Sequence, residues 1–475
     1  MAALAAAALA VSSPVRAQQQ LIEEAAAVMG GRERVLAAKT LVIEGDGVNG
    51  NLGQDMTPDA NEQRFTLSGY RRSIDLSQVR ARTEQTRTPG FVYFQGPQAQ
   101  KQVLGIDGEI AYNIAPTGAA TRVGGQAARD RLVEYYHHPL TIVRAALDPA
   151  AKVSNLRAEG HERLVDIALP NGVAVTLALD RATGQPSRVL SQTDNAVLGD
   201  VVVETTFAHY VTVGLLDLPT MLTTKTDRFV TAEVHVAKQT ANADTGDLAA
   251  PPLPAAAAAP ASVTVTSEVV APGVWLLAGQ SHHSVLVEFA DHLTLIEAPQ
   301  SEARALAVIA KAREVRPGKP LTQVVMTHHH FDHSGGIRAA ISEGLAVVAH
   351  QGNAAFVQEI AERPHTIVPD AQAKNPKPVT VVPVGDALTL QDSAMTVTLY
   401  PLAGNPHSDT MVVAHFPKEK LLVQADVYPQ PAAPSYQSNL LDNVRKRGLQ
   451  IDRIVGIHGT IQPFSALEQA VATAK

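Results

Sequence analysis

Apolar positions follow two different patterns along the chain, and the change falls near residue 262. From about residue 40 to 240, short segments such as "TLVIEGDG" and "ERLVDIALPNGVAVTLALDRATGQP" alternate apolar and polar positions. These segments are rich in Val, Ile and Thr and are separated by Gly, Pro or Asn-Gly, which is the pattern of antiparallel strands joined by turns. Residues 19–240 are therefore predicted to form a mainly antiparallel β-rich domain, whose role the pattern does not indicate.

Two segments of this region have helical spacing instead. Residues 21–38 predict one helix, and "ARDRLVEYYHHPLTIVRAAL" at 128–147 predicts a helical interruption between strands. His137 and His138 stand directly before a proline, a position that disfavours continued helix. We therefore expect these histidines to end or cap a helix rather than to bind a ligand.

After residue 262 the pattern becomes that of a layered α/β domain. The apolar strands "VWLLAG", "SVLVEFA" and "LTLIEAP" precede a helix, "EARALAVIAKAREV", and a buried strand, "LTQVVMT". Strands and helices alternate to residue 475, and polar residues collect where strands end, which is where α/β folds place their sites. Residues 241–262 are mostly Ala and Pro with few large side chains, so they predict a linker between the two domains.

Composition and net charge limit which partners and which metal ligands the chain can have. The chain has 475 residues, more than one core usually holds, and its 39 Lys and Arg against 46 Asp and Glu give a net charge of −7. This balance argues against nucleic acid as the main partner and leaves a small-molecule substrate as the expectation. Because cysteine is absent, disulfides, thiolate ligands and a cysteine nucleophile are excluded, and any metal must be held by imidazole and carboxylate.

The first residues, "MAALAAAALAVSSPVRAQQQ", form an alanine-rich apolar stretch that ends in Val15-Arg16-Ala17. A short apolar region before a small-residue cleavage site is typical of a signal peptide, so residues 1–17 are predicted to be removed. The alternative is a disordered or helical N-terminal tail. The mature protein is then expected to be periplasmic or secreted. No other stretch reaches the roughly 18–20 apolar residues of a membrane span.

The strongest chemical signal is "THHHFDHSGG" at residues 327–336. His328 and His330 are two apart on an extended stretch, so their side chains point to one side and can chelate one ion. Asp332 and His333 follow at once and, being adjacent, diverge towards a second ion. A histidine-rich surface loop is the alternative, but it predicts no partners downstream, and three appear after apolar runs: His407, Asp426 and His458.

This set resembles the metallo-β-lactamase superfamily of hydrolases over about residues 263–475. The resemblance implies an αββα sandwich with two sheets back to back and two Zn²⁺ ions at one edge, although iron or manganese also suits these ligands. It assigns one ion to His328, His330 and His407, the other to Asp332, His333 and His458, and makes Asp426 the bridge. In the implied mechanism a hydroxide between the ions attacks the substrate, and Asp332 orients it.

The carboxylate at Asp426 resembles the glyoxalase II, lactonase and phosphodiesterase branches, since true β-lactamases have cysteine or no protein ligand there. Together with the expected export, the carboxylate at Asp426 favours a binuclear zinc hydrolase that acts on a small ester, lactone or related acyl compound. The alternatives are β-lactam or phosphodiester hydrolysis, a mononuclear iron dioxygenase of the persulfide dioxygenase type, and a binding protein with the metal domain as a platform.

Several neighbouring residues are weaker candidates. His282 and His283 lie in a hairpin that in this family often overhangs the metals, so one of them is a candidate to contact substrate or donate a proton, with an exposed turn histidine as the alternative. Tyr428 follows Asp426 by two positions and is a candidate to contact the leaving group or the oxyanion. His329 is expected to point away from the ions, and Ser334 to cap the following helix. The family commonly has aspartate where this chain has Glu297, which we expect to be structural.

Overall fold

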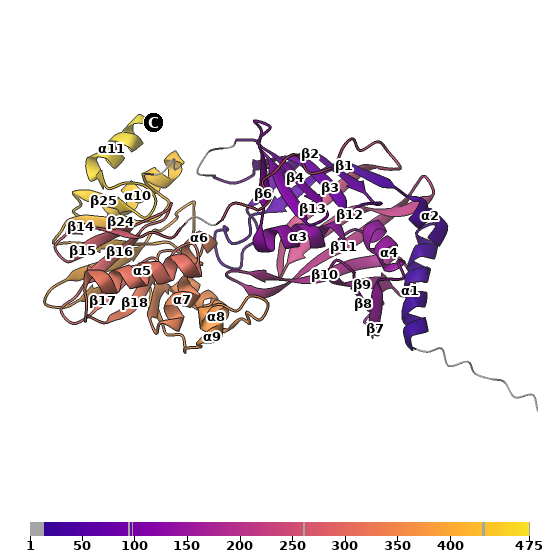
Figure 1. The fold of residues 1–475 in the computed structure, drawn as a ribbon. Helices are drawn as coiled ribbons and strands as arrows, with labels where there is room; N and C mark the ends of the chain where they lie inside the picture. The colour runs from indigo at the N-terminus through magenta and orange to yellow at the C-terminus, as the bar shows by residue number, and fades with distance from the viewer. Residues whose placement is uncertain (1–13, 94–95, 97, 260–261, 430–432, 475) are drawn as a thin grey trace, which may run out of the picture.

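The computed structural model describes residues 14–474 apart from 94–95, 97, 260–261 and 430–432, and it shows two domains side by side (Figure 1). The first is built on one large antiparallel sheet, and the second is an α/β domain with two sheets. The predicted fold class is therefore confirmed. Within the described residues, none of the helices has the length and apolar character needed to cross a membrane.

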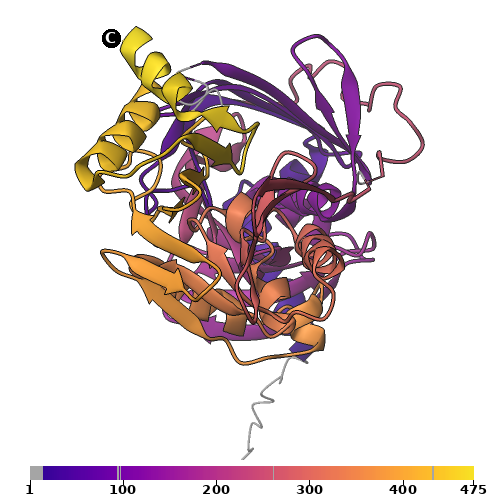
Figure 2. The same cartoon turned by 90° about the vertical axis from the view of Figure 1, so that its left-hand side faces the viewer.

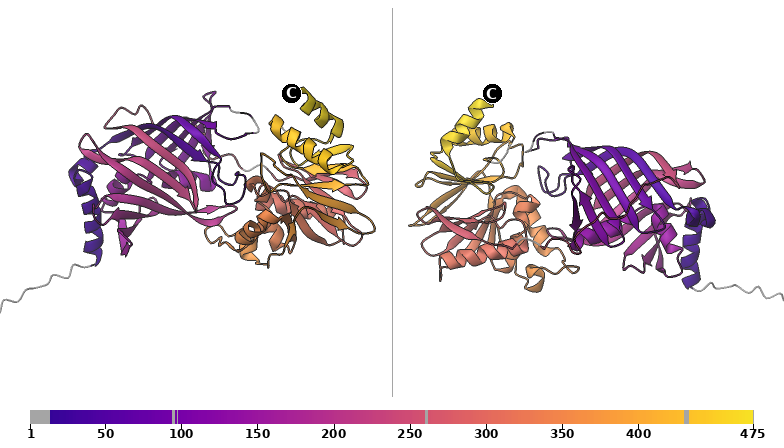
Figure 3. Two further views of the ribbon diagram at one scale, coloured as in Figure 1. Left: turned by 180° about the vertical axis from the view of Figure 1, so that it is seen from behind. Right: turned by 45° about the horizontal axis from the view of Figure 1, so that its top comes forward.

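The N-terminal sheet has 13 strands in the order β6-β5-β4-β3-β2-β1-β13-β12-β11-β10-β9-β8-β7. Strand β1 pairs with β13, so the first and last strands meet in the middle of the sheet. The sheet is strongly curved, and helices lie against its concave side (Figure 3). The strands are β1 (Thr40–Gly50), β2 (Arg64–Asp75), β3 (Arg80–Pro89), β4 (Gln100–Asp107), β5 (Ile110–Ile114), β6 (Ala120–Val123), β7 (Lys152–Glu159), β8 (Glu162–Ala168), β9 (Ala174–Asp180), β10 (Pro186–Asn195), β11 (Gly199–Val213), β12 (Leu216–Thr226) and β13 (Phe229–Ala241).

The helices of this domain correct one prediction. The single helix expected at 21–38 is wrong, because α1 (Pro14–Val28) and α2 (Arg32–Ala37) are separate. Gly30 and Gly31 between them have φ of 115° and 108°, a region that glycine adopts easily and that ends a helix. Of the predicted signal peptide, residues 1–13 lie outside the described residues and residues 14–17 begin α1.

The second helical segment divides at its two histidines, as predicted. Helix α3 (Gly125–Tyr135) ends before them and α4 (Pro139–Ala146) begins after them. His138 caps α4, since its ring nitrogen Nδ1 accepts a hydrogen bond from Leu140 N at 3.2 Å. His137 is buried, and its two ring nitrogens lie 2.9 Å from the hydroxyls of Thr205 and Ser191.

His137 is expected to make the fold acid-sensitive. Burial lowers the pKa of His137 to about 4, so between about pH 6.5 and pH 4 the unfolded chain binds a proton there that the folded chain does not. Stability is therefore lost as pH falls through this window, by roughly 2 kcal/mol at pH 5. The variant His137→Gln, which can still bond both hydroxyls, should lose less stability than wild type between pH 7 and pH 5. An identical change in melting temperature for the two proteins would contradict this.

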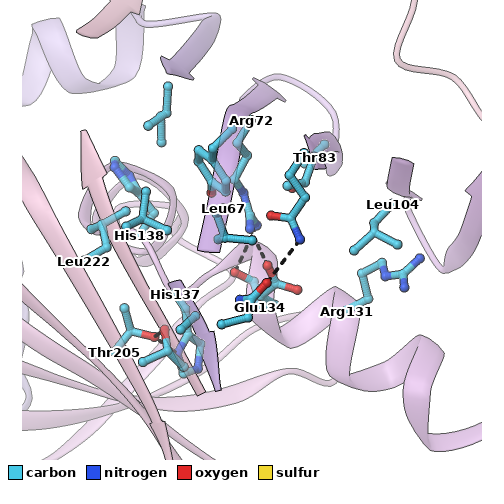
Figure 4. A pocket seen from close by; sticks show the side chains of 18 of the residues that line it. Leu67, Arg72, Thr83, Leu104, Arg131, Glu134, His137, His138, Thr205 and Leu222 are labelled. Atoms are coloured by element: carbon cyan, nitrogen blue, oxygen red, sulfur yellow. Dashed lines mark hydrogen bonds and ion pairs between the residues drawn. The ribbon is translucent and has the colours of Figure 1, made fainter. Parts of the chain in front are cut away.

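A cavity of about 340 Å³ lies inside the curved sheet (Figure 4). Its walls are partly aliphatic, with Leu67, Leu104 and Leu222 among them, and Arg72 and Glu134 face each other in it as an ion pair. The Glu134 side chain is 57% exposed although it comes from a helix inside the sheet, because it borders the cavity. The N-terminal domain is therefore hollow and partly charged within, not close-packed throughout.

The C-terminal domain holds a 7-stranded sheet, β14-β15-β16-β17-β18-β19-β20, and a 6-stranded sheet, β21-β22-β23-β24-β25-β26. The first comprises β14 (Thr266–Ala271), β15 (Val274–Ala278), β16 (Ser284–Glu288), β17 (Leu293–Ile296), β18 (Leu321–Met326), β19 (Ala346–His350) and β20 (Val381–Val384). The second comprises β21 (Leu388–Gln391), β22 (Thr396–Pro401), β23 (Val412–Phe416), β24 (Leu421–Gln424), β25 (Arg453–Gly456) and β26 (Gln462–Pro463). The helices are α5 (Glu302–Val315), α6 (Phe331–Ser334), α7 (Ile337–Ser342), the 3-10 helix η1 (Gln351–Asn353), α8 (Ala354–Glu362), α9 (Ala371–Lys374), α10 (Pro434–Arg447) and α11 (Phe464–Thr473).

Three apolar layers hold this domain together. Val325 of β18 and Val423 of β24 belong to the cluster between the two sheets. Val308 of α5 packs in a second cluster against the outer face of the first sheet, and Leu440 of α10 in a third against the outer face of the second. Figure 2 shows the resulting order, with α10 and α11 in yellow on one side. This is the αββα sandwich that the resemblance implies.

The segment between β13 and β14 contains no helix or strand among its described residues. It does not hang free, because Ala250 N donates to the Asp107 carboxylate at 2.9 Å and Tyr112 donates to Leu248 O at 3.4 Å. The domains also touch directly: Arg363 pairs with Asp227 at 3.0 Å. The chain between the domains therefore follows the surface of the first, and the second is held against it.

Candidate metal centre

The motif "THHHFDHSGG" lies where β18 ends and passes directly into α6 at the domain interface (Figure 1). His328, His330 and His333 are at most 1% exposed. The backbone that carries them is held on both sides, because Thr327 N donates to a Glu297 carboxylate oxygen at 2.7 Å and Thr327 O accepts from Val412 N at 2.8 Å. The side chains therefore project from a fixed turn rather than from a mobile surface loop.

Two groups of side chains can each hold a metal ion. Within each group, one nitrogen or oxygen atom per residue lies within 4.8 Å of the others. All residues expected as ligands fall into these groups, and one further histidine joins them. The first group is His328, His330, His407 and Asp426, and the second is His282, Asp332, His333 and His458.

The spacing inside the groups fits a tetrahedral ion. The Nε2 atoms of His328 and His407 are 3.3 Å apart, and those of His333 and His458 are also 3.3 Å apart. Two imidazole nitrogens bound to one zinc at 2.0–2.1 Å in tetrahedral geometry would be separated by about 3.3 Å. The histidines thus already stand at the distance that a shared ion imposes.

Asp426 contacts both groups. One of its carboxylate oxygens lies 2.8 Å from His458 Nε2, and the other lies 2.9 Å from His333 Nε2 and 3.0 Å from His407 Nε2. Its backbone has φ of 63°, an uncommon conformation that aspartate and asparagine tolerate better than most residues. This conformation follows β24 immediately and turns the carboxylate into the centre.

The imidazoles of His328 and His330 are in the form that binds metal. Burial first, and neighbouring histidines second, lower the pKa of both well below its ordinary value, so both rings are neutral. His330 Nδ1 is buried and has no hydrogen-bond partner, whereas its Nε2 is 2.9 Å from Asp55 O. An unpartnered ring nitrogen aimed into a ligand cluster fits a metal ion better than it fits a packed core.

Negative charge concentrates on the second group. Burial disfavours the charged form of His333, but Asp426, Glu297 and Asp332 together raise its pKa well above the ordinary value. Glu297 is fully buried and accepts from His333 Nδ1 at 2.9 Å, which orients the ring and leaves Nε2 facing Asp426. The expectation that Glu297 is structural agrees with these contacts, and its position behind a ligand is typical of groups that tune metal sites.

His282 and His283 separate in the structure. His282 Nε2 lies 3.1 Å from an Asp332 carboxylate oxygen, and its ring centroid is 3.7 Å from that of His458. His283 instead bonds Gly459 O through Nε2 at 3.1 Å, outside both groups. Of the two hairpin histidines, only the first therefore belongs to the centre.

The adjacent histidines His282 and His283 allow a direct test of this assignment, with His283 as the control. His282→Ala removes the partner that orients Asp332, and loss of such a partner typically lowers metal affinity by about 10–100-fold. His283→Ala should leave both metal affinities near wild type, because its ring contacts only backbone. Metal titration of the two variants against a competing chelator checks this, and equal affinities would contradict the assignment of His282.

The remaining expected positions lie outside the two groups. Tyr428 is 6% exposed and packs in the apolar cluster between the second sheet and α10. His329 points away, as expected, and bonds Thr410 Oγ1 at 3.1 Å. The prediction that Ser334 caps a helix is wrong: it is the last residue of α6, and its hydroxyl donates to His329 O at 2.9 Å.

Three contacts at the centre were not predicted from the sequence. Gln54 Nε2 donates to Asp332 at 2.7 Å, and the carbonyl of Asp55 faces His330. Tyr436 of α10 stacks edge-on against His407 with ring centroids 5.3 Å apart, and its hydroxyl donates to Val92 O at 2.7 Å. Gln54, Asp55 and Val92 come from the N-terminal domain, and no local pattern marks them.

Comparisons with known proteins match the part of the chain that contains most of this centre. Residues 278–456 match the model of the metallo-beta-lactamase superfamily. Among solved structures, a metallo-beta-lactamase from Pontibacter korlensis is 17% identical and matches 44% of this chain and 98% of its own, with a TM-score of 0.33. One from Hirschia baltica is 15% identical, with 44% and 96% covered and a TM-score of 0.35.

A stereoselective inverting sec-alkylsulfatase from Pseudomonas sp. is 17% identical, and the match covers 44% of this chain and 40% of that one, with a TM-score of 0.33. No curated protein matches the chain. The matched segment runs from β16 to β25 and contains every candidate ligand except His458, which lies two residues beyond it. The metallo-β-lactamase superfamily is thus the family that residues 278–456 of this chain match.

Proposed function

We propose that the chain is an exported, binuclear zinc hydrolase that cleaves an ester, a lactone or a related acyl bond of a small molecule. The observation that carries this proposal is the position of Asp426, whose carboxylate reaches His458 at 2.8 Å in one group and His407 at 3.0 Å in the other. A carboxylate between two histidine groups supports two ions that share it. Zinc is favoured because most of the surrounding ligands are imidazoles.

The two groups divide the ligands between the ions. One ion would be held by His328, His330 and His407, the other by Asp332, His333 and His458, with Asp426 between them. When bound, two such ions lower the pKa of a shared water and polarise the bond under attack.

Asp332 is placed to orient the attacking water. Burial raises the pKa of its carboxyl, but His333 and the hydrogen bond from His282 lower it by more, so the group is ionised. One oxygen accepts from Gln54 at 2.7 Å and the other faces His282 at 3.1 Å, which fixes the plane of the carboxylate. An ionised, oriented carboxylate can accept a hydrogen bond from the attacking water or hydroxide and so hold it in position for attack.

The composition supports an acyl substrate. The chain has no cysteine, so the ligand between the groups is a carboxylate, as in the glyoxalase II, lactonase and phosphodiesterase branches that the motif resembles. The net charge of −7 disfavours polyanionic substrates. The alanine-rich stretch within residues 1–17 supports export, and a small substrate outside the cytoplasm is then the consistent choice.

A substrate panel tests the proposal. Zinc-loaded protein and chelator-treated protein are incubated with chromogenic esters, lactones, phosphodiesters, sulfate esters and a β-lactam, and metal content is measured in parallel. We expect zinc-dependent turnover of an ester or lactone and close to two zinc ions per chain. If only a β-lactam, a phosphodiester or a sulfate ester is hydrolysed, the proposed substrate class is wrong and that compound class takes its place. A single bound iron ion per chain, together with consumption of oxygen, would overturn the assignment as a hydrolase.

A further inference from the structure

We infer that the N-terminal domain completes the metal centre: a loop between β1 and β2, residues 51–56, positions two of the ligands that the C-terminal domain supplies. This inference rests on the proposed metal-binding function and assigns a role to the first half of the chain. Residues of the loop are positioning residues, because they touch ligands rather than ions or substrate. The motif and the loop are far apart in sequence, with separations of 275 and 278 residues for their two side-chain contacts.

The loop reaches both groups. Gln54 donates to Asp332 at 2.7 Å in one, and the carbonyl of Asp55 lies 2.9 Å from His330 Nε2 in the other. With Nε2 donating to this carbonyl, the remaining nitrogen of His330, Nδ1, keeps its lone pair for an ion. The loop therefore selects the tautomer of one ligand and the orientation of another, which is how outer partners tune a metal site.

Backbone contacts dock the loop onto the motif. Phe331, between the two contacted ligands, donates its N–H to Gly53 O at 3.0 Å, and Asp409 N donates to Met56 O at 2.9 Å. Apolar contact adds to this, because Leu52 and Phe331 pack together in a cluster that includes Phe229 of β13. The loop is thus tied to both the segment carrying His330 and the segment after His407.

Hydrogen bonds within the N-terminal domain fix the shape of the loop. The Asp55 carboxylate is 5% exposed and accepts hydrogen bonds from three amides of its own domain, Met56 N, Glu62 N and Gln63 N, at 2.7–2.9 Å. Because these bonds lie within the N-terminal domain, the Asp55 carbonyl is presented in a fixed direction. A rigid outer contact holds a ligand better than a flexible one.

Gly53 provides a sharp test of docking. It has φ of 73°, and a Cβ at this position would overlap the Phe331 ring. Gly69 is a matched control in the same domain, since it has φ of 60° and open space around its Cβ position. Alanine at either position carries similar backbone strain, but only Gly53→Ala pushes the loop away from the motif.

The experiment measures metal binding by the full chain without substrate. Zinc affinities of wild type, Gln54→Ala, Gly53→Ala and Gly69→Ala are determined by competition with a chromogenic chelator, and the visible spectrum of bound Co²⁺ reports ligand geometry. Gln54→Ala should weaken the Asp332 site by about 10–100-fold, and Gly53→Ala should weaken both sites. Gly69→Ala should match wild type. Melting of each metal-free variant shows that the chain remains folded.

The outcomes separate this inference from the proposed function. Wild-type affinities and spectra in both Gln54→Ala and Gly53→Ala overturn the loop's role, whatever the substrate is. A wild-type chain that binds two ions but hydrolyses no ester or lactone overturns the substrate class and leaves the loop's role standing if the variants lose affinity. Wild type without affinity for a divalent ion overturns both.

Discussion

Replacing Asp332 with alanine is expected to reduce hydrolysis of the preferred ester or lactone by about a thousandfold while the chain stays folded. The side chain is 38% exposed and its hydrogen bonds are to Gln54 and His282 of the centre, so its loss costs little packing. Under the proposed function, what is lost is the carboxylate that orients the attacking water. Steady-state rates with zinc in excess, together with the melting temperature, check this.

His330→Ala accompanies this variant as a test of the other group. His330 is 1% exposed, so its removal opens a cavity and should lower stability as well as remove a metal ligand. We expect this variant to bind fewer ions than wild type. Full activity in either variant, with the chain folded, would be incompatible with the assigned centre.

Asp426→Asn is expected to have the second of the two largest effects. Asparagine tolerates the φ of 63° and has the same size, so the backbone turn after β24 should persist. The substitution removes the negative charge that faces His333, His407 and His458. We expect zinc content to fall from two ions to one or fewer, with a loss of activity of about a thousandfold, since ions contribute several kcal/mol to such reactions.

An exposed aspartate of the same domain is the control for this change. Asp442 lies on the outer side of α10, and Asp442→Asn makes the same chemical substitution away from the centre. Zinc content by elemental analysis and rates are measured for both variants. Two zinc ions per chain in Asp426→Asn would show that the carboxylate does not bridge.

The sequence predicted most of the centre because its signals are local. His328 and His330 are visible from a spacing of two on an extended segment, and Asp426 from its place at the end of an apolar strand. Strands β18 and β24 belong to different sheets, yet both lead directly into the centre. The αββα order followed from the resemblance, whereas the alternation of strands and helices predicted only a layered α/β domain.

The remaining contacts depend on tertiary structure. His282 could be placed near the metals only by resemblance, and its approach to Asp332 needs the fold. The segment carrying Gln54 has the composition of an ordinary polar turn, and its partner lies 278 residues away. Adjacent Gly30 and Gly31, by contrast, were a visible signal for the break that divides the predicted first helix.

The docked loop has a consequence for how the two halves cooperate. Because both are parts of one chain, the loop meets the motif at an effective concentration set by the connecting segment, which lies along the surface of the first domain. A few hydrogen bonds that would be too weak to hold two separate proteins together are then enough. The loop therefore needs no separate association step before it can position the ligands.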